Sequence, residues 1–137
     1  MTYRNYNAAK LSAVFGGIPI HGFAEDTLFE IEFEDAQYNE SSDIHGNITR
    51  ARLNKNLATI TLYLLQNSPS NNTLSSFVEA DRFNDNGVFP ITIKDANSDT
   101  LFVCSAAYVK QIPKISYGSE NGNREWVIRA TNISKFI

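Results

Sequence analysis

The stretch LATITLYLL, residues 57–65, is the part of the sequence that decides the expected fold. It is apolar on both faces of an extended chain and rich in residues that favour strands, so it predicts a central strand covered on both sides. Upstream, TLFEIEFE at residues 27–34 alternates apolar residues with carboxylates. This period of two predicts a half-buried strand, with Phe29, Ile31 and Phe33 on one face and Glu30, Glu32 and Glu34 on the other.

A helix is expected directly after the central strand. Ser68 followed by Pro69 is typical of a helix start, with serine as the N-cap and proline in the first turn. Leu74, Phe77 and Val78 follow at helical spacing. A helix over about residues 69–82 should therefore pack one apolar stripe against a sheet.

Further strand patterns complete the expected architecture, at LSAVF, NITRARL, VFPITIK, TLFVCSAAYV and REWVIRAT. Pro90 within VFPITIK predicts a strand that lies at a sheet edge or begins after the proline. No linker or repeat divides the chain. We therefore expect a single domain over residues 1–137, mainly β (α+β), built as an antiparallel sandwich or barrel of about seven strands with one flanking helix.

Length and composition limit the class of protein. The 137 residues include no apolar run long enough to span a membrane, so no membrane insertion is expected. The first residues lack the pattern of a secretory signal. A single cysteine, Cys104, cannot form an internal disulfide, and this favours the cell interior over the disulfide-rich secreted class.

Charge is distributed unevenly along the chain. Eight of the 15 acidic residues lie between Glu25 and Asp43, and no lysine or arginine falls among them. The molecule is therefore expected to have an acidic side and a basic side, which favours head-to-tail association between copies. The plainer interpretation is a solvated acidic strand and loop.

Two polar segments and several charged residues are candidates for contacts between subunits. Residues 35–46 lack a hydrophobic pattern and predict a long loop that becomes ordered against a partner, and the arm at residues 1–9 has the same character. NITRARL could pair antiparallel with the acidic strand and set arginine against glutamate. The candidate inter-subunit residues are Asp35, Glu40, Asp43, Arg50 and Arg52.

No catalytic, cofactor or metal site is expected. His21 lies in a predicted turn and His45 in the polar segment, and neither belongs to a nucleophile motif. Cys104 falls in an apolar strand, where an inert buried thiol is the common case. DANSD at residues 95–99 has alternating oxygen ligands but lacks the glycine and glutamate of a calcium loop, which favours a hairpin turn.

Taken in order, several segments resemble the major tail tube proteins of contractile-tailed bacteriophages. The most specific part is the run from the two-faced strand through Leu65-Gln66-Asn67-Ser68-Pro69-Ser70-Asn71 into the helix, and REWVIR at residues 124–129 supports it. The resemblance covers nearly the whole chain. It implies a barrel-like sandwich whose copies form hexameric rings, stacked into a hollow tube that conducts double-stranded DNA.

The resemblance also implies a location and partners. The tube would lie in the virion tail, after assembly in the host cytoplasm. It would contact the sheath protein, the tape measure protein, and the baseplate and tail terminator proteins. An acidic wall suits a duct for DNA because basic groups would hold the phosphates. Glu30, Glu32 and Glu34 are the candidate lumen face, unless they face Arg50 and Arg52 of a neighbouring strand or subunit.

Three other functions remain open from the sequence. One is a different tube of the same lineage, such as a secretion-system tube or a baseplate tube component. Another is a monomeric β-sandwich that binds carbohydrate or peptide in a groove of Trp126 and tyrosines. A hydrolase is the least favoured, since the sequence presents no catalytic group.

Overall fold

A computed structural model describes residues 7–34, 37–53, 56–95 and 100–136. Within these ranges it contains nine strands, one α-helix and a short 3₁₀ turn at Ala8–Lys10. The strands are β1 (Leu11–Phe15), β2 (Ile18–Pro19), β3 (Phe29–Phe33), β4 (Tyr38–Ser42), β5 (Ile48–Arg52), β6 (Leu57–Leu65), β7 (Phe89–Asp95), β8 (Thr100–Gln111) and β9 (Asn123–Phe136). The helix α1 spans Ser70–Asn84.

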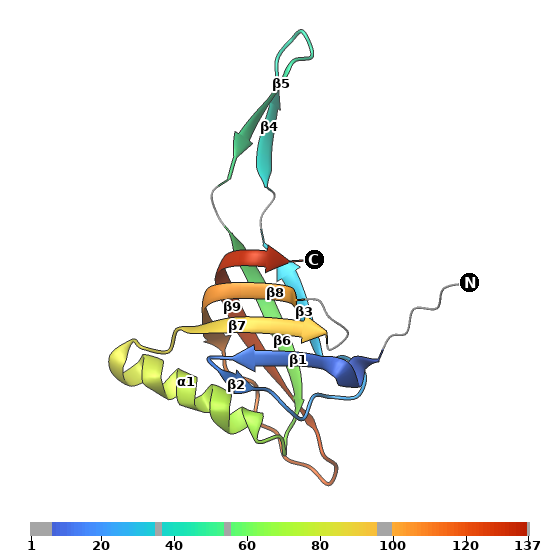
Figure 1. The fold of residues 1–137 in the computed structure, drawn as a ribbon, viewed down its shortest axis with the longest axis vertical. Helices are drawn as coiled ribbons and strands as arrows, with labels where there is room; N and C mark the ends of the chain where they lie inside the picture. The colour runs from blue at the N-terminus through green and yellow to red at the C-terminus, as the bar shows by residue number, and fades with distance from the viewer. Residues whose placement is uncertain (1–6, 35–36, 54–55, 96–99, 137) are drawn as a thin grey trace, which may run out of the picture.

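Seven of these strands form one antiparallel sheet in the order β2-β1-β7-β8-β9-β6-β3. Figure 1 shows two layers, with β1, β7 and β8 crossing in front of β6, β3 and the lower part of β9. The long strands β8 and β9 bend from one layer into the other, and their pairing contains register shifts of the β-bulge type. The sheet does not close into a barrel within the described residues, because β2 and β3 remain at its two ends. The mainly-β sandwich with one helix is therefore confirmed.

The core lies between the two layers. It contains the inward-facing residues of β6, namely Ala58, Ile60, Leu62 and Leu64, and those of β9, β7 and β1 opposite them. Phe15, Phe89 and Phe77 stack on one another at the flank, with ring centroids 5.8 and 4.3 Å apart. Cys104 is buried on β8, as expected for an inert thiol, and burial raises the pKa of its thiol.

The helix begins and packs as the sequence predicts. Pro69 already has helical dihedral angles, and the Ser68 hydroxyl accepts the backbone N–H of Ser70 at 3.2 Å. Leu74 is completely buried and anchors the helix, while Phe77 and Val78 pack beside it. Asp81 on the same side accepts the N–H of Gly87 at 2.7 Å and fixes the turn into β7.

Two expectations about the strands need correction. The strand containing Pro90 is not at an edge, since β7 lies between β1 and β8. Proline has no backbone N–H to donate to a neighbouring strand. The β7–β8 register shifts between Phe89 and Ile91, so Pro90 does not have to donate a hydrogen bond to β8 at this point. Strand β6 is buried on one face only, because its other face, with Thr59 and Tyr63, remains partly exposed.

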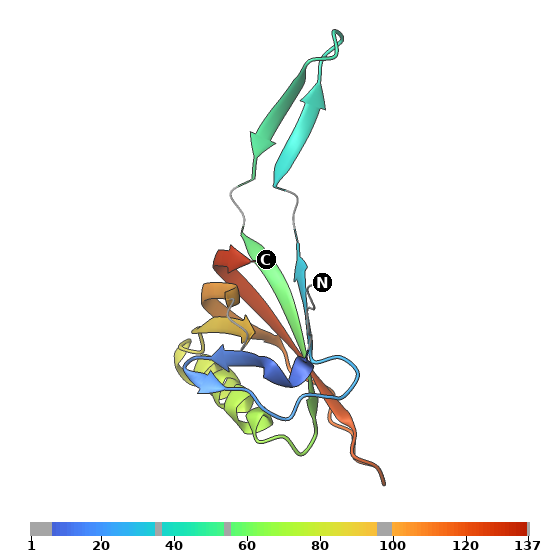
Figure 2. The ribbon, with the colours of Figure 1, turned by 45° about the vertical axis from the view of Figure 1, so that its right-hand side comes forward.

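The segment predicted as a loop over residues 35–46 is also corrected. It contains β4, which pairs with β5 in a separate two-stranded sheet from Tyr38↔Arg52 to Ser42↔Ile48. This hairpin, residues 37–53, projects far from the body of the molecule, as Figures 1 and 2 show. The sequence pattern hid it because every residue of both strands is exposed, so there is no buried face to produce alternation.

Candidate assembly surfaces

The first candidate surface is the outer face of β3, β6 and β9, which we call the open face. Glu30, Glu32 and Glu34 all lie on it and all are exposed. Register places Thr61 and Thr59 of β6 beside the first two, and Val127 and Arg129 of β9 follow in the same rows. Glu125 is a fourth carboxylate on this face. Among the described residues, the open face therefore has four negative side chains and two positive ones, Arg129 and Lys110.

Glu34 on the open face contacts both a hydroxyl group and a guanidinium group. The Thr59 hydroxyl donates a hydrogen bond to Glu34 Oε1, and Arg129 Nη1 lies 3.7 Å from the same oxygen. The Thr59 hydrogen bond first, and then the charges of Arg129 and Lys110, hold the pKa of Glu34 below its ordinary value. Glu34 is therefore fixed as an anion at neutral pH.

Glu30 interacts with the next strand in a different way. The Tyr63 hydroxyl donates to Glu30 Oε2 at 3.4 Å. Burial, and then the charge of Glu30, raise the pKa of Tyr63 above its ordinary value. Two carboxylates of the open face, Glu30 and Glu34, thus accept hydrogen bonds from hydroxyl groups of β6.

The predicted pairing of arginine with the acidic strand is wrong. Strand β5 pairs with β4 in the hairpin, and β3 pairs with β6, so Arg50 and Arg52 do not lie against the glutamates of β3. Arg129 is the cation that does, and sequence reasoning missed it. The alternation in REWVIR could have identified it, since Trp126 and Ile128 are buried and Arg129 must face the other way.

The second candidate surface is the hairpin itself. Directly opposite residues of an antiparallel pair share a face, so register places Glu40 opposite Arg50, and Tyr38 opposite Arg52, on one side. The Arg50 guanidinium also lies 4.5 Å from the centre of the Tyr38 ring. The structure therefore brings together three of the predicted inter-subunit residues. A fourth, Asp35, lies outside the described residues.

Asp43 organises the hairpin turn. Its Oδ1 accepts the backbone N–H groups of His45 at 2.8 Å and Asn47 at 2.9 Å, and its Oδ2 accepts the Asn47 side chain at 3.0 Å. Gly46 completes the turn with a φ of 82°, which a residue with a side chain rarely adopts. The backbone and side-chain hydrogen bonds from Asn47, followed by that from His45, lower the pKa of Asp43.

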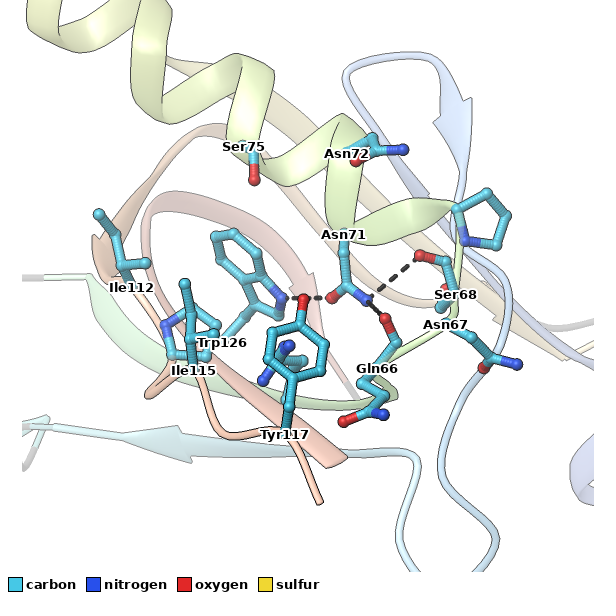
Figure 3. Close-up of a pocket in the computed structure, with 13 residues that line it drawn as sticks. Gln66, Asn67, Ser68, Asn71, Asn72, Ser75, Ile112, Ile115, Tyr117 and Trp126 are labelled. Carbon is cyan, nitrogen blue, oxygen red and sulfur yellow. Dashed lines mark hydrogen bonds between the residues drawn. The ribbon is translucent and has the colours of Figure 1, made fainter. Parts of the chain in front are cut away.

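The third candidate surface is a groove of about 470 Å³ between the start of α1 and the segment that connects β8 to β9. Figure 3 shows Asn71 at its centre. The Asn71 side chain accepts the Trp126 Nε1–H at 2.9 Å and donates to the carbonyl oxygens of Leu65, Gln66 and Ser68 at 3.0 to 3.2 Å. One side chain thus joins the β6–α1 connection to β9.

Exposed apolar side chains line the outer wall of this groove, which we call the α1 groove. Ile112, Ile115 and Tyr117 all belong to the β8–β9 connection and all are exposed. The buried Arg124 guanidinium lies against Tyr117, 5.0 Å from the ring centre. The groove therefore combines an apolar wall with a cation.

The residues considered for catalysis and metal binding lie apart from one another. The His21 backbone N–H donates to the Ser70 hydroxyl at the start of α1, whereas His45 lies in the hairpin turn between β4 and β5. Within the described ranges no three histidine, cysteine, aspartate or glutamate side chains gather as metal ligands. Of the segment considered as a calcium loop, residues 95–99, Asp95 ends β7 and residues 96–99 lie outside the described residues. No described helix has the length and apolar character needed to cross a membrane.

Comparison with known proteins shows which family the chain belongs to. Residues 22–137 match the model of the family described as "Bacteriophage PhiTE tail tube protein". The chain belongs to this family. The resemblance to phage tail tube proteins is therefore confirmed.

A curated relative agrees with the family assignment, and three solved structures share the fold. The relative, "Structural protein ORF10" of Pseudomonas phage KPP10, is 32% identical over 116 residues, which cover 81% of this chain and 65% of that protein. The chain thus spans about two thirds of the length of this relative.

The solved structures are the tube-terminating cap of the anti-feeding prophage and two proteins of the extracellular contractile injection system PVC. The cap has a TM-score of 0.66 and 17% identity, covering 98% of this chain and 92% of that one. The chain from the PVC sheath–tube complex has a TM-score of 0.64 and 16% identity (97% and 93% covered). The chain from the PVC sheath/tube terminator has a TM-score of 0.60 and 15% identity (97% of each covered). At these identities the likeness is one of fold.

Proposed function

We propose that this protein forms hexameric rings that stack into a hollow tube, and that the tube conducts double-stranded DNA during ejection. Membership of the tail tube family supports the tube, and the projecting hairpin supports stacking. A two-stranded hairpin is marginally stable alone, so an exposed one is best explained by a partner surface in the assembly. No chemical reaction is required for this role, which is that of a structural subunit and not an enzyme.

The open face is the proposed wall of the channel. Its three glutamates stand in line along β3, and its two cations lie among carboxylates. A wall of this kind offers DNA no continuous basic surface, so phosphates would release few counterions on contact and bind weakly. The duplex could then slide without being held.

Electron microscopy tests the assembly. Negative-stain images of the purified protein, recorded over a range of concentrations together with its mass in solution, should show rings or hollow tubes with sixfold end views. A particle that stays monomeric at every concentration, even after baseplate seeds are added, would contradict the proposal. It would instead favour a monomeric binding module.

The channel wall needs a separate test. Virions carrying Glu30→Lys, Glu32→Lys and Glu34→Lys together should assemble normal tails but eject DNA slowly or incompletely, with a defect that lessens as salt rises. A matched control carries Asp26→Lys, Glu79→Lys and Glu120→Lys, which change the charge equally at exposed positions outside β3, β6 and β9. Normal ejection by the first variant would remove the electrostatic role.

The proposed partners follow from the position of a tube within a contractile tail. The sheath protein would surround the tube, the tape measure protein would fill it during assembly, and the baseplate and tail terminator proteins would bound its ends. The virion tail is the final location, after assembly in the host cytoplasm. Pull-down of these proteins with purified tubes, but not with the unassembled subunit, is the expected result.

A tube-end component of the same lineage is the second candidate function. The observation that favours it is the likeness in fold to a tube-terminating cap and to a sheath/tube terminator, with TM-scores of 0.66 and 0.60, compared with 0.64 for a chain of the sheath–tube complex. Microscopy separates the two. A terminator would form single rings that stop growing, while a tube subunit would form stacks of increasing length.

A further inference from the structure

The hairpin carries apolar side chains that the subunit itself does not cover. Ile44 in the turn is 93% exposed, and Ile48 and Tyr38 on the strands are exposed as well. Among the described residues no hydrogen bond joins β4 or β5 to the seven-stranded sheet. A protruding apolar side chain on an ordered turn is typical of an anchor that enters a pocket on a partner.

The α1 groove lies at the other end of the molecule. In Figures 1 and 2 the hairpin projects from one end of the long axis, while the start of α1 and the β8–β9 connection lie at the opposite end. Figure 3 shows Ile112 and Ile115 on one side of the groove, Asn71 and the start of the helix on the other, and the Trp126 ring between them. Surfaces at opposite ends of one subunit can meet only between different copies.

Arg124 gives this groove its chemical preference. It is only 6% exposed, and its guanidinium donates to the Lys114 carbonyl oxygen at 3.4 Å, a long hydrogen bond. Within the residues that the structure describes, no carboxylate lies within ion-pair distance of it. A buried cation without a counter-charge is costly, so the groove is suited to a ligand that brings a carboxylate along with apolar surface.

We propose that the hairpin turn of one subunit docks in the α1 groove of a second copy, with Ile44 against the Ile112, Ile115 and Tyr117 wall and the Asp43 carboxylate directed to Arg124. The turn presents these two groups at adjacent positions. Asp43 keeps one acceptor position free on Oδ2 while it holds the turn, because a carboxylate offers about four positions and the turn uses three of them. The contact is heterologous, so it propagates along an axis instead of closing a dimer. It rests on the proposed tube and names the stacking contact within it.

Cross-linking between copies tests the contact directly. A double variant, Ile44→Cys with Ile115→Cys, is assembled and treated with a short bismaleimide, while the natural Cys104 is buried and contributes little background. Head-to-tail docking predicts a ladder of covalent multimers on a denaturing gel. The control variant, Ile44→Cys with Phe83→Cys, places the second thiol on an exposed position of α1 outside the groove, and should give no ladder.

The two proposals fail in different ways. Tubes seen by microscopy without a ladder from the first variant would overturn the docking contact and leave the tube intact. A ladder of equal strength from the control would also overturn it. A protein that never assembles would refute the tube, and the docking contact with it.

The charge contact has its own test in Asp43→Asn. The asparagine oxygen can still accept the backbone N–H groups of His45 and Asn47, although its amide nitrogen cannot accept the Asn47 side chain, and the negative charge proposed to pair with Arg124 is removed. The critical concentration for assembly should rise on the order of tenfold, which corresponds to losing one charge-assisted contact. The control, Asp85→Asn, changes the same residue type at a helix end where asparagine tolerates the left-handed conformation, and should leave assembly unchanged. An unchanged critical concentration for Asp43→Asn would refute the pairing with Arg124.

Discussion

Replacing Asn71 by alanine should weaken the fold through one buried polar group. The Trp126 indole is 3% exposed, and its N–H donates to Asn71 Oδ1. Without that acceptor the buried donor is unsatisfied, at about 1–3 kcal/mol. The three carbonyl oxygens that receive the Asn71 amide lie in the β6–α1 connection, where water can replace the lost donor. A loss of about 2–3 kcal/mol in the free energy of unfolding is therefore expected.

The assay is urea and thermal unfolding at a concentration below assembly, followed by tryptophan fluorescence. Trp126 is the only tryptophan, so its emission reports this site alone. With an unfolding entropy of about 2.1 cal/mol/K per residue, 1 kcal/mol corresponds to about 3.5 °C for a chain of this length, and the midpoint should fall by about 7–10 °C. The neighbouring, exposed Asn72→Ala is the control and should change stability by less than about 0.5 kcal/mol. If Asn71→Ala also changed the free energy of unfolding by less than about 0.5 kcal/mol, the reasoning would be refuted.

Three further outcomes follow from the packing and the turns. Leu74→Ala should lower the free energy of unfolding by about 3–5 kcal/mol, because it empties a fully buried site, whereas Phe83→Ala, 82% exposed, should cost almost nothing in urea titrations. Gly16→Ala should destabilise by about 1–3 kcal/mol in the same assay, since the backbone has a φ of 62° and a new Cβ would lie 2.8 Å from the Phe77 ring. The Asp43 turn, whose carboxylate has a lowered pKa, should stay ordered at neutral pH and loosen only as the pH falls through that lowered value. NMR titration of the turn amides would contradict this if their midpoint lay at or above the ordinary aspartate pKa of about 3.9.

The elements with a buried face could be read from the sequence. Phe29 and Ile31 in the alternating strand, and Leu74, Phe77 and Val78 at helical spacing, pack against the core, so pattern and burial agree at these positions. Phe33, on the same predicted face as Phe29 and Ile31, is an exception, because it is 41% exposed. Cys104 was predicted to be buried for the same reason. Local capping at Ser68 and Pro69 was also predictable, because it depends only on neighbouring residues.

The hairpin and the placement of Pro90 could not be read in this way. Both strands of the hairpin are exposed on both faces, so hydrophobic alternation is absent and a polar stretch is indistinguishable from a loop. Strand order is a non-local property as well. Pairing β3 with β6 instead of with β5 decides that Arg129, and not Arg50, faces the glutamates. The groove joins residues more than 50 positions apart, which no local pattern indicates.

Folding and assembly are carried by largely separate sets of residues. The core residues of β6, β9 and α1 are buried within one subunit, whereas the glutamates of the open face and the hairpin side chains are exposed. Exposed substitutions away from special backbone positions change stability little, so the charged substitution Ile44→Glu should fold normally while losing assembly, unlike the apolar Ile44→Cys. The α1 groove is where the two sets meet, because Asn71 and Trp126 hold the framework while Ile115 and Tyr117 remain free to receive a partner. Substitutions that loosen this framework should therefore lower the stability of the subunit and also weaken its assembly. Of the three candidate surfaces, only the α1 groove should show both effects in the same variant.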